Sequence, residues 1–277
     1  MSERTARLGV ISSFFSEAFL GAYHTEHIET PWGAAPVDLA SVDGTPVACI
    51  WRYGRGLDIA SHRINYRANL WALRILGVER VVSQNAIGSC RPDIPPGAVV
   101  IPSDFLDFTQ GRTRSFFADT GAWVRVDVTD PFCAEVRAAL LAAAVPLFDQ
   151  VEPQGVFLCG EGPRFETRAE IRMFRQLGAD IIGTPLVPEV VLAREAELCF
   201  ASIAAIINFA SGLADEVKHV GPGSMVDFYY NSGFHDRIEL AIRAALRALP
   251  AERACSCGRA MEHAFHGNAP EWYRPRA

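Results

Sequence analysis

The sequence lacks any apolar run approaching the roughly 20 residues that a helix needs to span a bilayer. Its opening stretch, MSERTARLGV, also lacks the apolar core of a signal peptide. We therefore expect a cytoplasmic protein without membrane contact. Clustered basic residues are missing too, because the arginines are scattered and the formal charge is -6. This composition argues against nucleic acid and favours a small-molecule partner.

The chain is also without linker-like segments and internal repeats. Its 277 residues are 49% hydrophobic, which is enough to bury one large core. We predict a single domain over residues 1–250, followed by a C-terminal tail over residues 251–277.

The most informative stretch covers residues 155–195. An apolar strand over 156–159 ends at glycine breaks, and a helix follows with Thr167 as its expected N-cap and Glu170 three residues on. A second strand over 179–182 leads into another helix. Such a parallel unit binds ligands at the carboxyl ends of its strands, so the pattern predicts an α/β fold.

Apolar patterns elsewhere predict the remaining core elements. Expected strands cover 8–11, 47–51, 78–83 and 199–209, and expected helices cover 64–76, 140–148 and 238–249. Residues 85–89 follow a strand end and are expected to form a loop.

Phe165 and Glu166 lie side by side in the loop after strand 156–159. A planar heterocycle would use both, the ring for stacking and the carboxylate as an acceptor for ring N–H groups. Alternatively, Phe165 packs in the core and Glu166 faces the first turn of the helix, where the dipole favours an acid. The two residues alone leave both interpretations open.

Several long blocks carry a resemblance to a known family. They are GEGPRFETRAEIRMFRQLGAD at 160–180, VPEVVLARE at 187–195, RYGRG at 52–56, INYRANLWALRILGVERV at 64–81, AIGS at 86–89, DFLDFTQGR at 104–112 and DPFC at 130–133. With these blocks the chain resembles the purine nucleoside phosphorylase superfamily, in its 5′-methylthioadenosine phosphorylase branch. The resemblance implies a single α/β domain with a central mixed, twisted β-sheet flanked by helices. It also implies a homotrimer that needs no cofactor and acts in purine salvage.

For the purine, the resemblance implies a site of Phe165, Glu166 and Asn208, with Glu166 and Asn208 as catalytic residues. Family members that prefer 6-aminopurines carry aspartate at the last position, and those that prefer 6-oxopurines carry asparagine. An amide can bond to O6 and to N7, which gains a proton or a hydrogen bond as the glycosidic bond breaks. Asn208 therefore favours a 6-oxopurine, unless it simply ends a strand in a turn.

The phosphate side departs from the family pattern. The family's Gly-Gly-Ser/Thr-Gly loop begins here with Ser12, Ser13 and Phe14, so a phenylalanine stands where the phosphate-binding hydroxyl is expected. In the family's Arg-His-Gly motif the arginine is kept as Arg52, and the histidine is Tyr53. Arg52, Ser12 and Ser13 remain candidates for phosphate binding, because a shift of one residue could replace the lost donor.

Two further loops of the implied site also differ. Asn85 replaces the Ser/Thr before Ala86 in a loop that touches phosphate and ribose, and Thr184-Pro185 replaces a Met-Ser/Thr pair. Ala86 and Thr184 remain candidates for substrate binding, and Asn85 for phosphate binding. Each lost charge-assisted donor is worth about 1.5–3 kcal/mol, so three or four losses would leave inorganic phosphate bound weakly or not at all.

Residues 214–231 form a polar stretch broken by glycine and proline. The resemblance implies a lid over the ribose 5′ substituent, with His219 as a contact. A lone histidine in a loop could equally be solvated.

Seven cysteines, an odd number, fit buried thiols in a reducing compartment. In the tail, Cys255 and Cys257 precede His263 and His266, and two cysteines with two histidines can form a zinc site. The one-residue gap between the cysteines is shorter than usual for zinc, and the resembling phosphorylases carry a Cys-x-Cys without metal. We expect no metal here, and either an exposed thiol pair or a disordered tail.

Three functions remain open. The first is phosphorolysis of a purine nucleoside, 5′-modified as in 5′-methylthioadenosine or 5′-methylthioinosine, at a remodelled phosphate site. The second is hydrolysis of the same nucleosides, with water as the acceptor. The third is a non-catalytic role in nucleoside binding or subunit interaction.

Overall fold

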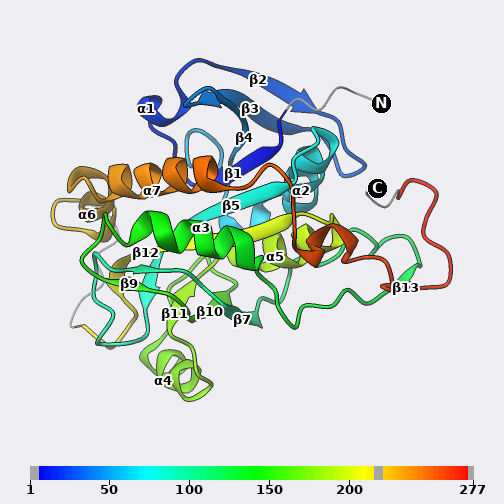
Figure 1. Cartoon of the computed structure of the whole chain (residues 1–277). Coiled ribbons are helices and arrows are strands. Elements are labelled where there is room, and N and C mark those ends of the chain that lie inside the picture. The colour runs from blue at the N-terminus through cyan, green and yellow to red at the C-terminus, as the bar shows by residue number, and fades with distance from the viewer. Residues whose placement is uncertain (1–5, 215–220, 274–277) are drawn as a thin grey trace.

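The computed structural model describes residues 6–214 and 221–273, which are arranged around a β-sheet (Figure 1). The strands are β1 (Leu8–Ser12), β2 (Tyr23–Ile28), β3 (Ala35–Val42), β4 (Thr45–Trp51), β5 (Arg80–Ser89), β6 (Val99–Val100), β7 (Asp104–Phe108), β8 (Trp123–Val124), β9 (Val151–Glu152), β10 (Val156–Gly160), β11 (Ile181–Gly183), β12 (Cys199–Phe209) and β13 (Phe265–His266). The helices are α1 (Glu17–Leu20), α2 (Tyr66–Ile75), α3 (Ala134–Ala144), α4 (Arg168–Gln176), α5 (Leu186–Glu195), α6 (Met225–Asn231) and α7 (Phe234–Ala248), with 3-10 turns η1 (Ser61–Arg63) and η2 (Ser256–Arg259). Within these residues, no helix has both the length and the apolar character to cross a bilayer.

The main sheet has 11 strands and is mixed. Its order is β2-β3-β4-β1-β5-β11-β10-β7, and β12 pairs with β5 and β6 beside this path. Helices α3 and α7 pack on one face, while α2 and α5 pack on the other (Figure 1). The predicted α/β class, with a central mixed sheet flanked by helices, is confirmed.

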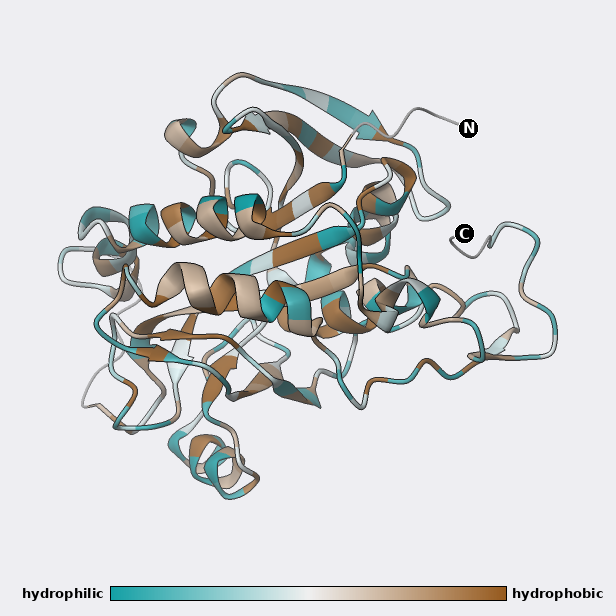
Figure 2. Ribbon diagram, viewed as in Figure 1, coloured by the Kyte–Doolittle hydropathy of each residue, from teal (hydrophilic) through white to brown (hydrophobic). Residues whose placement is uncertain are grey.

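Strands β5 and β12 are parallel neighbours at the centre of the sheet. Successive side chains of β12 point to opposite faces: Ala201 and Ile203 join the hydrophobic cluster with α3 and α7, and Phe200 and Ala204 join the cluster with α2 and α5. Figure 2 shows hydrophobic colour along stretches of the central strands. A strand buried on both faces needs a continuous apolar run, which is why β12 was predicted with its observed bounds.

The unit β10-α4-β11 also agrees with the sequence. Strands β10 and β11 are parallel. Thr167 caps α4, because its hydroxyl accepts the Glu170 N–H at 3.1 Å and the Glu170 carboxylate accepts the Thr167 N–H at 2.7 Å. This reciprocal capping box is the signal that located the helix start.

Three local predictions are wrong in their bounds. Residues 85–89 are not a loop, because β5 continues through them and pairs with both β12 and β11. Helix α3 begins at Ala134 instead of residue 140 and ends at Ala144, because its many alanines weaken the apolar periodicity. Within the expected loop 214–231, residues 225–231 form α6, capped by Ser224.

The C-terminal segment returns to the domain instead of leaving it. Met261 and Tyr273 are buried in the hydrophobic cluster with α2 and α5, and Cys257 is buried in the cluster with α3 and α7. Trp272 stacks on Phe117 with ring centroids 5.3 Å apart. The expectation of an exposed thiol pair or a disordered tail is therefore wrong for residues 251–273.

Glu195 gives the fold a testable dependence on pH. The side chain is buried at the end of α5, where its Oε2 accepts the Phe116 N–H at 2.8 Å. Burial raises the pKa of this carboxyl from 4.5 to about 7. Between these values the folded chain holds a proton that the unfolded chain releases, so the free energy of unfolding falls as pH rises through this window.

Glu195→Gln should remove the fall in the free energy of unfolding with rising pH. The glutamine amide does not titrate, and its oxygen can still accept the Phe116 N–H. The free energy of unfolding of the variant, relative to the parent, should rise by up to about 3 kcal/mol as pH rises from 4.5 to 7. Urea unfolding at several pH values measures this difference, and the exposed Glu262→Gln is the matched control. A difference that does not change with pH would contradict the assignment.

Candidate functional site

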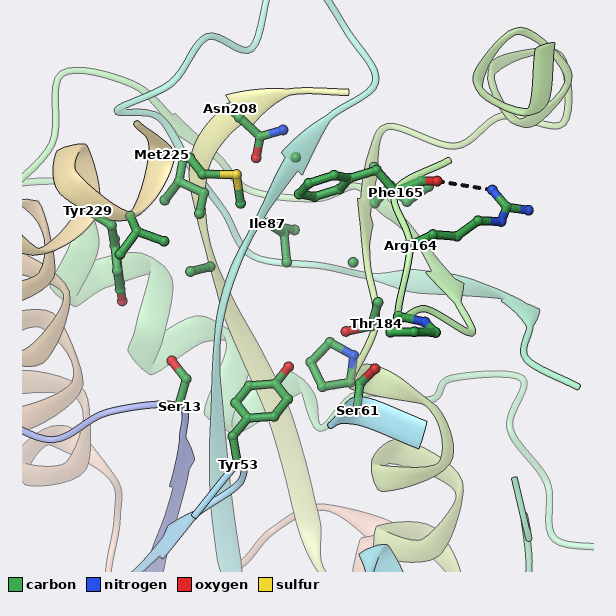
Figure 3. Close-up of a pocket in the computed structure, with 18 of the residues that line it drawn as sticks. Ser13, Tyr53, Ser61, Ile87, Arg164, Phe165, Thr184, Asn208, Met225 and Tyr229 are labelled. Atoms are coloured by element: carbon green, nitrogen blue, oxygen red, sulfur yellow. Dashed lines mark hydrogen bonds between the residues drawn. The ribbon is translucent and has the colours of Figure 1, made fainter. Parts of the chain in front are cut away.

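A cavity of about 440 Å³ opens at one edge of the sheet. The last residues of β5, β11 and β12 line it, together with the segments that follow β1, β4 and β10 and one side of α6 (Figure 3). Ligands of α/β proteins bind at such strand ends, since side chains from several strands converge there. The cavity is therefore the candidate functional site.

Phe165, Glu166 and Asn208 all line the cavity, and Phe165 and Asn208 lie toward the same end of it (Figure 3). Figure 3 shows the Asn208 amide close to the Phe165 ring. Burial raises the pKa of the Glu166 carboxyl above its usual range. Two glycines make room for these groups: a Cβ on Gly160 would lie 3.1 Å from Glu166 Oε1, and one on Gly88 would lie 3.2 Å from Asn208 Nδ2.

The Asn208 amide is held in place by the backbone of the next residue. Its Nδ2 donates to the Phe209 carbonyl at 2.7 Å, which orients the side chain at the end of β12. The Phe165 ring can stack on the face of a nitrogen heterocycle. The Glu166 carboxylate and the Asn208 amide can hydrogen-bond to its edge.

Hydroxyl groups line the opposite end. Ser13 and Tyr53 lie there (Figure 3), and Tyr230 joins them from α6. The Tyr53 side chain hydrogen-bonds to Thr184, and the Tyr230 side chain hydrogen-bonds to Ser13. Burial raises the pKa of both tyrosines, so both stay neutral near pH 7.

Positive charge is scarce around the cavity. Among the described residues, Arg164 is the cationic side chain in the lining. Its guanidinium pairs with Glu170 at 2.7 and 2.8 Å, and the side chain is 65% exposed. An anion in the cavity would thus meet hydroxyls and one arginine already engaged with a carboxylate.

Arg52 lies outside the cavity lining. Its guanidinium is buried, with Nε 2.6 Å from Glu189 Oε1, Nη2 2.7 Å from Ser83 Oγ and Nη1 3.0 Å from the Gln84 carbonyl oxygen. The Arg52 guanidinium, which the sequence suggested for phosphate binding, forms an ion pair with Glu189 in this structure.

Ser12 and Asn85 are also buried away from the cavity lining. Ser12 Oγ donates to Gln84 Oε1 at 2.5 Å, and Asn85 Nδ2 donates to Ser202 Oγ at 2.8 Å. Both side chains therefore complete hydrogen bonds between strands.

Phe14 fills space next to the cavity with an aromatic cluster. Its ring packs edge-on against Trp51 at 5.7 Å, and against Tyr230 and His235 at 5.3 Å. The position expected to carry a phosphate-binding hydroxyl is thus occupied by a packed ring.

The structure brings together six of the residues singled out from the sequence. The residues that line the cavity are Ser13, Ala86, Phe165, Glu166, Thr184 and Asn208. Those that do not are Ser12, Arg52 and Asn85, and His219 lies outside the described residues. Sequence reasoning missed Ser61, Met225 and Tyr230; the tyrosine pair in α6 was the available signal for the last.

Comparison with known proteins gives the family. A model of the family described as "Phosphorylase superfamily" matches residues 26–243. The chain is 39% identical over 267 residues to a "Probable 6-oxopurine nucleoside phosphorylase" of Thermococcus kodakarensis, covering 93% of this chain and 98% of the relative. It is 43% identical over 236 residues to a "Probable S-methyl-5'-thioinosine phosphorylase" of Methanopyrus kandleri, covering 85% and 90%.

Solved structures agree with these relatives. A methylthioadenosine phosphorylase sourced from an Antarctic soil metagenomic library aligns with a TM-score of 0.87 at 31% identity, covering 95% of this chain and 93% of that one. Methylthioadenosine phosphorylase from Schistosoma mansoni in complex with adenine aligns with a TM-score of 0.83 at 29% identity, covering 94% and 99%. The resemblance seen in the sequence is confirmed: this chain belongs to the phosphorylase superfamily.

Proposed function

We propose that this protein is a pentosyltransferase of the nucleoside phosphorylase type that cleaves the N-glycosidic bond of a purine nucleoside. Its relatives carry the names of 6-oxopurine nucleoside, S-methyl-5'-thioinosine and S-methyl-5'-thioadenosine phosphorylases. The observation that carries the proposal is that Phe165, Glu166 and Asn208 line one cavity, with Phe165 and Asn208 toward the same end of it.

The purine base is assigned to that end. Phe165 stacks on the ring system, and Glu166 accepts a ring N–H group. As the glycosidic bond breaks, electrons move into the purine, and N7 gains a hydrogen bond from the Asn208 amide. One Nδ2 proton is engaged with the Phe209 carbonyl, and the other can be shared between N7 and O6, so the preferred base is a 6-oxopurine.

The ribose occupies the middle of the cavity, where Ile87 and Met225 provide apolar walls. Methionine is polarizable and adapts its shape, so Met225 suits a small apolar 5′ substituent such as a methylthio group. The preferred substrate class is therefore a 5′-modified 6-oxopurine nucleoside. Of the lid expected over 214–231, His219 lies outside the described residues, whereas Met225 and Tyr230 of α6 line the cavity.

The hydroxyl-lined end of the cavity, to which the acceptor of the pentosyl group is assigned, offers little positive charge in the part of the chain that the structure describes. Ser13, Tyr53 and Tyr230 can donate hydrogen bonds to phosphate, but neutral hydroxyls bind a dianion less well than cations do. We therefore expect weak binding of inorganic phosphate. The same neutral, hydroxyl-lined end supports a second candidate, a nucleosidase in which water is the acceptor. A homotrimer, a cytoplasmic location and a role in purine salvage are further parts of the proposal that rest on the resemblance.

Base preference is tested by Asn208→Asp. A carboxylate accepts from the exocyclic amine of a 6-aminopurine and repels O6, at about 1–3 kcal/mol for such a contact. The ratio of kcat/KM for 5′-methylthioinosine to that for 5′-methylthioadenosine should therefore fall roughly 10- to 100-fold. The exposed Asn268→Asp makes the same chemical change outside the cavity and should leave this ratio unaltered. An unchanged ratio in Asn208→Asp would remove Asn208 from the base site.

The acceptor is tested by product identity. Purine release from 5′-methylthioinosine, 5′-methylthioadenosine and inosine is measured with and without phosphate, and the sugar product is identified. We expect release that depends only weakly on phosphate concentration. Ribose 1-phosphate from inosine, or 5-methylthioribose 1-phosphate from the two methylthio nucleosides, formed with ordinary saturation by phosphate would establish an intact phosphate site. A nucleoside that binds without any purine release would reject catalysis.

A variant sharpens this test. Pro185→Ser adds a hydroxyl and a backbone N–H at the cavity wall, both absent in proline. Serine is also a good residue for the N-cap position that Pro185 occupies before α5. The dependence of the rate on phosphate should therefore become steeper in Pro185→Ser and stay as in the parent in the exposed Pro250→Ser.

A further inference from the structure

Four cysteines that are far apart in the sequence meet at one place outside the cavity. Cys133 precedes α3, and Cys199 begins β12. In the C-terminal segment, Cys255 precedes the turn η2 and Cys257 belongs to it. Their four Sγ atoms all lie within 4.8 Å of one another, and Cys199 Sγ is 3.3 Å from Cys255 Sγ. Cys133, Cys199 and Cys257 are buried, and Cys255 is half-buried.

These separations fit a tetrahedral metal site. Four sulfurs at the usual zinc distance of about 2.3 Å would lie about 3.8 Å from one another. That separation is longer than the 3.3 Å between Cys199 Sγ and Cys255 Sγ and shorter than the 4.8 Å within which all four sulfurs lie. We propose that Cys133, Cys199, Cys255 and Cys257 bind one Zn²⁺ ion as a closed structural site. All four ligands come from the protein, so no position is left for a substrate.

The surroundings suit the charge of such a site. Zinc with four thiolates carries a net charge of about -2, which needs nearby donors and cations. Arg194 Nη1 donates to Cys257 Sγ at 3.6 Å. The Val136 N–H donates to Cys133 Sγ in the first turn of α3, where the helix dipole favours a thiolate.

A second arginine lies against η2. Arg253 Nη2 would be 2.6 Å from a Cβ on Gly258, the residue after Cys257, so the guanidinium rests on the backbone there. Its Nη1 donates to the Glu197 carbonyl at 3.0 Å, close to the start of β12. Arg253 thus connects η2, which contains Cys257, with the residues just before β12, which begins with Cys199.

This ligand set differs from the one considered in the sequence. His263 and His266 are exposed and do not belong to the cluster, whose other members are Cys133 and Cys199. Soft thiolate ligands in tetrahedral geometry select zinc among the common divalent ions. The ion would join the C-terminal segment to both α3 and β12 and so hold in place the segment that contains Trp272 and Tyr273.

The first experiment measures metal in the full chain. The protein is purified under reducing conditions without chelators, and zinc is quantified by mass spectrometry. We expect about one zinc per chain in the parent and a large loss in Cys255→Ala and Cys257→Ala. Cys49→Ala is the matched control, because Cys49 is a buried thiol of the same hydrophobic cluster that lies outside the four-cysteine group.

A cobalt titration does not depend on the folding of any variant. The reduced, metal-depleted parent chain should bind Co²⁺ with the thiolate charge-transfer and visible bands of tetrahedral sulfur coordination, and Zn²⁺ should displace it. Absence of both zinc and these bands would overturn the proposal. So would an intact mass, under denaturing and non-reducing conditions, that reveals disulfides among the four cysteines in the freshly purified chain.

Discussion

The buried ion pair between Arg52 and Glu189 joins three elements next to the cavity. Arg52 follows β4, Glu189 belongs to α5, and Ser83 of β5 donates to Glu189 Oε2 at 2.9 Å. Both charged side chains are almost fully buried, at 1% and 2% exposure. Burying two charges is tolerated because each oxygen and nitrogen has a partner, and removing either one alone would cost about 3–5 kcal/mol.

This pair also determines which groups face a ligand. Turning the Arg52 fork toward an anion in the cavity would leave Glu189 as a buried charge without its counterion. In this structure the guanidinium pairs with Glu189, while its neighbour Tyr53 presents a neutral hydroxyl to the cavity. Within residues 6–214 and 221–273, the hydroxyl-lined end of the cavity has little positive charge because Arg52 is paired with Glu189 inside the core.

Local signals in the sequence predicted local structure well. The capping box of Thr167 and Glu170 and the apolar run of β12 depend on neighbouring residues, and the base end follows from residues at the ends of predicted strands. Other features depend on contacts between residues that are distant in the sequence. Nothing near Arg52 indicates that Glu189 will neutralise it, and nothing near Cys255 indicates that Cys133 will approach.

The two ends of the cavity differ in how easily chemistry there can change. At the end of the cavity assigned to the purine base, Glu166 lies next to Gly160 and Asn208 lies next to Gly88. Both side chains face the cavity, so each can be exchanged without disturbing a packed core. At the acceptor end, Phe14 is one ring of a packed aromatic cluster. Replacing it by a small hydroxyl would leave a void costing about 3–5 kcal/mol, as with other large-to-small changes. Under the proposed assignment, single substitutions would change base preference, whereas building a phosphate site would require coordinated repacking of several rings.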